Sequence, residues 1–151
     1  MVFMEDVGVH IRGVISFEKL LQRFRSGLPD DVGAIACFVG VVRGRTVDGR
    51  RVKRLLYECA DDVPEQFRRI VRDAGSRPGI KKVAIHHVVD GLSPGEDTLY
   101  VMVAGRGRAE VFSVLREIVE RVKSEAHIWK KEITESGEYW VHEKEQHEKD
   151  G

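Results

Sequence analysis

Apolar residues in the first periodic segment of the chain recur three or four positions apart. They are Phe17, Leu20, Leu21 and Phe24. This spacing predicts an amphipathic helix over 16–25, with the Ser16 hydroxyl as its N-cap. Gly27 and Pro29 follow the segment and favour the end of the helix.

Two strand-like runs come next, joined by a cationic loop. GAIACFVGVVR at 33–43 is apolar and contains several β-branched residues, so it predicts a mostly buried strand. VKRLLYEC at 52–59 predicts a second strand. Because the Asp48-Gly49 pair between them is a tight-turn signal, we expect the two strands to form a hairpin.

A second helical stripe lies between residues 62 and 75. Its apolar members are Val63, Phe67, Ile70, Val71 and Ala74. Asp62 followed by Glu65 resembles a capping box, Pro64 is acceptable in a first turn, and Gly75 ends the stripe. The segment therefore predicts a helix that begins after Asp62.

The second half of the chain shows the same alternation of strand and helix patterns. Strands are predicted at 81–89 and 97–105, and the apolar period of 3.6 residues over 109–124 predicts a helix. HIWKKEIT at 127–134 and YWVHEKE at 139–145 predict a final hairpin.

The order of these elements predicts an α+β fold with an antiparallel sheet, packed helices and a C-terminal β-hairpin subdomain. We expect a single domain over 1–151, with its core at about 33–141 and a charged, flexible tail at 143–151. No internal repeat or linker divides the sequence.

Composition narrows the classes of function. The 151 residues are 42% hydrophobic and 33% charged, and no apolar run reaches the ~18 residues that a spanning helix needs. Lysine plus arginine number 25, as do aspartate plus glutamate, so the net charge does not draw the molecule onto nucleic acid or a membrane. With no secretory signal pattern, we expect a cytoplasmic protein that binds neither.

Cysteine and histidine have ordinary interpretations here. Cys37 and Cys59 lie in apolar runs without a C-x-x-C pattern, so we expect two buried thiols. His86 and His87 are adjacent in a predicted strand and should point to opposite faces. None of the six histidines has the spacing of a metal site, so we expect no metal ion.

Clusters of cations are the remaining candidates for chemistry. One runs from Arg43 to Arg54 and another is GRGR at 105–108; each suits either phosphate or carboxylate binding or a solvated surface. Lys123 and Lys130-Lys131 flank a predicted helix–strand turn. If the turn brings them into one pocket, a lysine becomes usable in acid–base or nucleophilic chemistry. The helix dipole explains a lysine at a helix C-terminus equally well.

Three aromatic residues fall on the last predicted hairpin, at Trp129, Tyr139 and Trp140. We expect them to pack against one another across the strands. A surface for a partner protein is the alternative interpretation.

Six segments of the chain, taken in order, resemble one protein family. They are GAIACFVGVVRG at 33–44, LLYE at 55–58, HHVVDGLSPGED at 86–97, GRAEVF at 107–112, VKSEAHIWKKE at 122–132 and GEYWV at 137–141. Together they are similar to the large, catalytic subunit of molybdopterin synthase. The resemblance implies the α/β-hammerhead fold of that family.

The resemblance also implies an activity, sulfur transfer to cyclic pyranopterin monophosphate, which yields molybdopterin in molybdenum cofactor biosynthesis. In that family the sulfur comes from a small ubiquitin-like subunit, whose C-terminal Gly-Gly thiocarboxylate enters a pocket of the large subunit. Because the sulfur arrives activated on the partner, we expect neither a cofactor nor a reactive cysteine in this chain. A cyclic phosphate and a carboxyl terminus both suit a cationic site.

Site residues follow from the resemblance position by position. Lys123 and Lys130 match the family's two functional lysines, and we expect them to activate the thiocarboxylate and stabilise anionic intermediates. Lys123 should lie nearer the partner's terminal glycine. The substrate-binding residues implied are Val41, Val42, Arg43, Gly107, Arg108, Lys123, Lys130, Lys131 and Glu132.

Two positions depart from the family pattern. The family usually has His-Arg before the long helix, whereas this chain has Gly107-Arg108, so the arginine is kept and the histidine is absent. His127 stands where a proline usually precedes I-W-K-K-E, and would relax the turn or supply an imidazole. Neither change touches the two lysines.

The resemblance further implies a homodimer of this chain that binds one small subunit per copy, giving a heterotetramer with pockets completed across the dimer. The alternative is a non-catalytic homologue that binds the ubiquitin-like partner or a phosphate ligand without turnover. A nucleic-acid-binding module that uses the loop from Arg43 to Arg54 is a third hypothesis, against which the zero net charge argues.

Overall fold

The computed structural model describes residues 6–141, and within them three helices and two four-stranded sheets. In chain order the elements are β1 (Asp6–His10), α1 (Phe17–Arg25), β2 (Ala34–Val41), β3 (Val52–Cys59), α2 (Val63–Gly75), β4 (Ile80–Val88), β5 (Gly91–Leu92), β6 (Asp97–Gly105), α3 (Arg108–Glu125), β7 (Ile128–Thr134) and β8 (Gly137–Val141). The predicted tail at 143–151 and the end of the last predicted strand lie outside the described residues.

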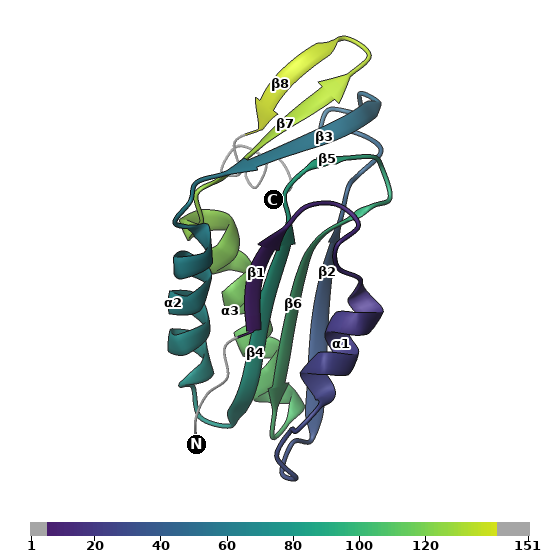
Figure 1. Ribbon diagram of the computed structural model, residues 1–151. Coiled ribbons are helices and arrows are strands. Elements are labelled where there is room, and N and C mark those ends of the chain that lie inside the picture. Colours follow the sequence, from purple (N-terminus) through teal and green to yellow (C-terminus); the bar gives the residue numbers. More distant parts are fainter. Residues whose placement is uncertain (1–5, 142–151) are drawn as a thin grey trace.

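The two sheets lie one beyond the other (Figure 1). The main sheet has the order β1-β4-β6-β2, in which β1 runs parallel to β4 and the other pairs are antiparallel. Helices α2 and α3 cover one of its faces and α1 covers the other. The small sheet has the antiparallel order β5-β3-β7-β8 and projects past one end of the main sheet. The predicted α+β fold is confirmed.

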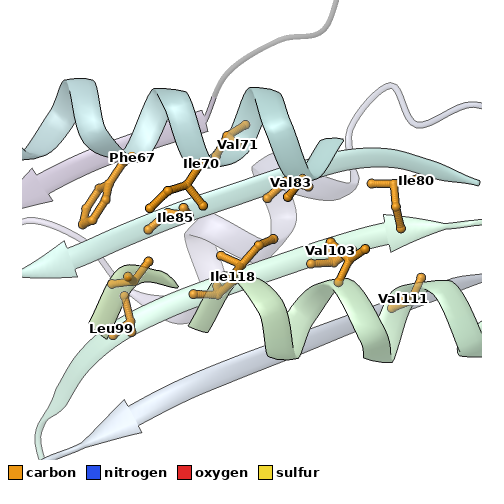
Figure 2. Packing of buried hydrophobic residues seen from close by; sticks show 14 of the residues in the cluster. Phe67, Ile70, Val71, Ile80, Val83, Ile85, Leu99, Val103, Val111 and Ile118 are labelled. Atoms are coloured by element: carbon orange, nitrogen blue, oxygen red, sulfur yellow. The ribbon is translucent and has the colours of Figure 1, made fainter. Parts of the chain in front are cut away.

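Side chains of β4 and β6 alternate between two hydrophobic clusters, because successive residues of a strand point to opposite faces. Val83 and Ile85 belong to the cluster under α2 and α3, with Phe67 and Ile118 among its fully buried members (Figure 2). Ala84, the residue between them, belongs to the cluster under α1. The main sheet is therefore buried on both faces, and it forms the rigid base from which the small sheet projects.

Helix starts show one correct and one wrong prediction. Ser16 caps α1 as predicted, because its Oγ accepts a hydrogen bond from the Lys19 backbone N–H at 3.3 Å. The capping box predicted at Asp62 is wrong, since the side chain makes no capping hydrogen bond to α2. Its carboxylate lies instead 3.1 Å from Nδ1 of His127, at the turn between α3 and β7.

The hairpin predicted between the strands at 33–43 and 52–59 is wrong. β2 pairs with β6, whereas β3 pairs with β5 and β7 in the other sheet. The turn at Gly49 does form, with φ 91°, but it closes only a local bridge between Arg45 and Arg51. The connection therefore carries the chain from the main sheet to the small one.

Two strands have no counterpart among the predicted elements. β1 adds a parallel edge to the main sheet, and the two-residue β5 attaches the loop after β4 to the small sheet. No helix among residues 6–141 is long and apolar enough to cross a membrane.

Candidate active site

A cleft lies where the small sheet meets the end of the main sheet. It consists of two adjoining cavities with volumes of about 80 and 310 Å³. Both are lined by Phe38, Gly40, Tyr57, Thr98, Lys123 and Lys130. The wider cavity is large enough for a small organic ligand, and we call the pair the lysine cleft.

The two lysines reach the lysine cleft from different elements. Lys123 lies in the last turn of α3, directly after the buried Val122, and Ala126 ends that helix. Lys130 lies on β7, opposite Tyr57 of β3 and Val141 of β8. The structure thus confirms that the helix–strand turn brings Lys123 and Lys130 into one pocket, with Lys123 exposed and Lys130 half-buried.

The wider cavity adds the predicted residues at the end of β2 and directly after it. Val41, Val42 and Arg43 line it together with Glu132, which lies two positions after Lys130 on the same face of β7. Val42 is buried in the cluster under α1, so it anchors the segment, whereas the Arg43 side chain is exposed. Three cations and one carboxylate therefore surround this cavity, which favours an anionic ligand.

Three predicted site residues lie elsewhere in one copy of the chain. The side chain of Lys131 lies on the other face of β7, where its Nζ is 4.8 Å from the centre of the Trp140 ring and 3.4 Å from Glu138 Oε2. Gly107 and Arg108 lie at the N-terminus of α3, whereas Lys123 lies near its C-terminus. At 1.5 Å rise per residue, about 22 Å of helix separates Arg108 from Lys123.

The sequence interpretation missed His87 as a residue of the lysine cleft. His87 lies on β4, lines the narrower cavity and is only 6% exposed. Its Nδ1 donates a hydrogen bond to the Val88 carbonyl at 2.8 Å, and its ring meets the edge of Tyr57 at 4.9 Å between centroids. Burial is the main cause that lowers the pKa of His87 to about 4, and the charges of Lys123 and Lys130 contribute to this shift. His87 is therefore neutral at physiological pH.

His86, by contrast, points to the opposite face of β4, as predicted. Its Nδ1 lies 2.9 Å from Nε2 of His10, and its Nε2 lies 2.7 Å from the Asp6 carboxylate. Arg23 donates a second hydrogen bond to that carboxylate at 2.6 Å. This network ties β1 to β4 and α1 and takes no part in the lysine cleft.

The residue in place of the family's proline tethers the turn that sets the lysine positions. The His127 backbone N–H donates to the Gln66 side-chain oxygen at 2.9 Å, and the ring contacts Asp62 as described. Both contacts are exposed and connect the α3–β7 turn to the start of α2. His127 is thus a structural residue of the turn and does not line the lysine cleft.

Two further expectations need correction. Cys37 and Cys59 are half-buried rather than buried, and burial raises the pKa of both thiols.

The aromatic residues Trp129, Tyr139 and Trp140 are 52%, 40% and 50% exposed, so the predicted cross-strand packing is wrong. The strand register explains this, because Trp140 lies opposite Lys131 and Tyr139 lies opposite Glu132.

Comparisons with known proteins agree on one family. The family model described as MoaE protein matches residues 12–125. The molybdopterin synthase catalytic subunit of Pyrococcus abyssi is 36% identical over 110 residues, which cover 72% of this chain and 74% of that protein. The probable molybdopterin synthase of Haloferax volcanii is 33% identical over 133 residues, 86% of this chain, and this chain spans about half (51%) of its length.

A solved structure extends the likeness to the fold. The X-ray crystal structure of molybdopterin synthase from Staphylococcus aureus superposes with a TM-score of 0.80 at 25% sequence identity. The match covers 91% of this chain and 98% of that one. Both sheets described above therefore fall largely within the shared fold.

Proposed function

Because this chain belongs to the MoaE family, that of the molybdopterin synthase catalytic subunits, we propose that it transfers sulfur to cyclic pyranopterin monophosphate in molybdenum cofactor biosynthesis. The observation that carries the proposal is the meeting of Lys123, Lys130 and Arg43 in one cleft of suitable volume. The protein acts in the cytoplasm and needs no metal ion or other cofactor.

The sulfur donor is the C-terminal thiocarboxylate of a small ubiquitin-like subunit that ends in Gly-Gly. In each transfer the bond between sulfur and the donor's carbonyl carbon breaks, and on the pterin a carbon–sulfur bond replaces a carbon–oxygen bond, whose oxygen leaves with the opened cyclic phosphate or as water. A water oxygen takes the place of sulfur on the donor, which leaves as a carboxylate. Each step passes through anionic species that ammonium and guanidinium groups stabilise in a cleft partly shielded from water.

The positions of the three cations suggest their roles. Arg43 lines only the wider cavity and offers a fork of N–H donors for the cyclic phosphate. Lys123 and Lys130 line both cavities, so they reach the reacting atoms of donor and acceptor alike. Lys123, which is the more exposed, meets the thiocarboxylate of the partner, and Lys130 acts in proton transfer and charge stabilisation.

The distance along α3 supports a homodimer. Gly107 and Arg108 lie about 22 Å of helix away from Lys123, so they cannot serve the lysine cleft of their own copy. In a two-fold dimer, the N-terminus of α3 from one copy completes the cleft of the other. With one small subunit bound at each cleft, the assembly is a heterotetramer.

Single-turnover sulfur transfer tests this function. The protein is mixed with thiocarboxylated small subunit and cyclic pyranopterin monophosphate, and sulfurated pterin is measured by mass spectrometry. We expect product from the wild type and at least about a hundredfold less from Lys123→Ala. Lys19→Ala, which removes an exposed lysine on α1, is the matched control and should match the wild type.

The absence of the family's histidine at Gly107 favours one rival, a homologue that binds without turnover. That rival predicts no product from the wild type even though the small subunit binds. Binding of the small subunit to wild type and Lys123→Ala, measured by calorimetry, separates loss of chemistry from loss of the complex.

A further inference from the structure

His87 is the one imidazole that lines the lysine cleft among the described residues, and the function proposed above does not use it. It lies on β4 of the main sheet, across the narrower cavity from Lys130 on β7 of the small sheet. A polar side chain that is 6% exposed needs hydrogen-bond partners, because an unpaired buried polar group is costly.

The hydrogen bond to Val88 fixes which ring nitrogen of His87 carries the proton. A backbone carbonyl only accepts hydrogen bonds, so Nδ1, at 2.8 Å from the Val88 oxygen, is the protonated nitrogen. In a neutral ring Nε2 then has a lone pair and accepts. No buried polar side-chain atom lacks a partner among the described residues, so this nitrogen contacts either the open space of the cavity or a donor.

The groups that face His87 are mostly donors. Of the residues that line the narrower cavity, those that titrate besides His87 are Tyr57 from β3, Lys123 from α3 and Lys130 from β7. The positive charges of Lys123 and Lys130 both act on the imidazole, that of Lys123 more strongly. Lys123 and His87 line the same small cavity, so the ammonium group of Lys123 is a charged donor within reach of the Nε2 lone pair.

We propose that His87 is a positioning residue for sulfur transfer: its neutral ring accepts a hydrogen bond at Nε2 from the Lys123 ammonium group and directs that group into the cleft. This role rests on the proposed function. It concerns only the orientation of Lys123, and no proton passes to the imidazole.

The chemistry of the cleft explains why an imidazole suits this position. A carboxylate there would pair with Lys123 and cancel the positive charge that attracts a thiocarboxylate and a phosphate. A further cation there would repel both lysines. A neutral acceptor orients an ammonium group without changing the net charge of the cleft.

Paired substitutions separate this hydrogen bond from packing. His87→Phe keeps a ring against Tyr57 but removes both nitrogens, whereas His87→Gln keeps an acceptor at a similar reach. We expect the single-turnover rate to fall about tenfold or more in His87→Phe and to stay within about threefold of wild type in His87→Gln. His10→Gln, outside the cleft, is the control and should retain the wild-type rate. A His87→Phe rate within about twofold of wild type, or equal losses in both variants, overturns the proposal.

A spectroscopic measurement tests the contact without activity. In protein labelled with 15N-histidine at pH 7, we expect the His87 ring to show a protonated Nδ1 and an unprotonated Nε2. Lys123→Ala should shift the Nε2 resonance, and Lys19→Ala should not. A Nε2 resonance that Lys123→Ala leaves unmoved overturns the inference. If the wild type makes no sulfurated pterin but this shift is seen, the proposed function fails and the contact stands.

Discussion

At the scale of single residues, spacing along the chain located the lysines but not the histidine. Lys123 and Lys130 flank a short turn after a strongly periodic helix, and such a turn leaves little freedom in where they meet. His87 alternates with Val83 and Ile85 on the core-facing side of β4, so its pattern is that of a buried strand residue. Only the packing of the small sheet against the end of β4 turns that position into part of a cleft.

The buried His87 makes stability depend on pH in the mildly acidic range. Its pKa is lowered from 6.5 to about 4 in the folded state, so protonation favours unfolding. Stability is complete above pH 6.5 and falls as the pH drops toward 4, by about 3 kcal/mol in total. Urea unfolding between pH 4 and 7 should show this slope in wild type and a flatter one in His87→Gln. Equal slopes would contradict the assignment.

Asp6 acts in a separate and more acidic range. Burial raises its pKa, but hydrogen bonds from His86 and Arg23 outweigh that effect and hold the pKa at about 2. The stabilisation is present above pH 3.8 and is lost as the pH falls through about 2, which amounts to about 2 kcal/mol. Asp6→Asn should remove this dependence in urea unfolding between pH 2 and 4.5. Asp31→Asn, at an exposed ion pair with Lys81, should change it much less.

At the scale of elements, periodic segments were predictable and strand partners were not. The helices and most strands appear where apolar period and turn chemistry placed them. The β2–β3 hairpin failed because a turn at Gly49 fixes only a local reversal, while β2 finds its partner, β6, more than fifty positions away. β1 and β5 are too short and too weakly patterned to be recognised without the strands they join.

The two helix starts offer a matched test of capping. Ser16→Ala removes an acceptor from the Lys19 N–H and should lower the free energy of unfolding by about 1 kcal/mol. Asp62→Ala removes no capping bond and only an exposed contact with His127, so we expect less than about half that loss. Thermal and urea unfolding of both variants at pH 7 would measure the two losses in the free energy of unfolding. A larger loss in Asp62→Ala would mean that the α3–β7 turn depends on this contact.

At the scale of the whole molecule, the predicted site residues divide into two groups that one copy keeps apart. Arg43, Lys123, Lys130 and Glu132 line the lysine cleft, whereas Arg108 lies at the far end of α3. The sequence resemblance named both groups, but the length of α3 decides that a single copy cannot unite them. In the proposed homodimer a second copy brings the two groups together.

Mixing two inactive variants tests the shared site. In the proposed dimer, a copy with Lys123→Ala paired with a copy with Arg108→Ala has one cleft that carries both changes and one that carries neither. Equal amounts of the two variants are dissociated together and allowed to form dimers again. Up to about a quarter of wild-type sulfur transfer should then return, since half the dimers are mixed and each of these has one intact cleft of two. No recovery, although the mixed dimers are detected by native mass spectrometry, would place Arg108 outside the site.

The position of the lysine cleft also bears on motion within the molecule. Its walls come from different sheets, with His87 and Thr98 on the main sheet and Tyr57 and Lys130 on the small one. In the proposed function a substrate held by both walls bridges the two sheets, so amide hydrogens of β7 should exchange more slowly with solvent when substrate is bound. Those of β4 and β6, buried on both faces, should change little. The proposed substrate would thus itself be one of the contacts that hold the two sheets together.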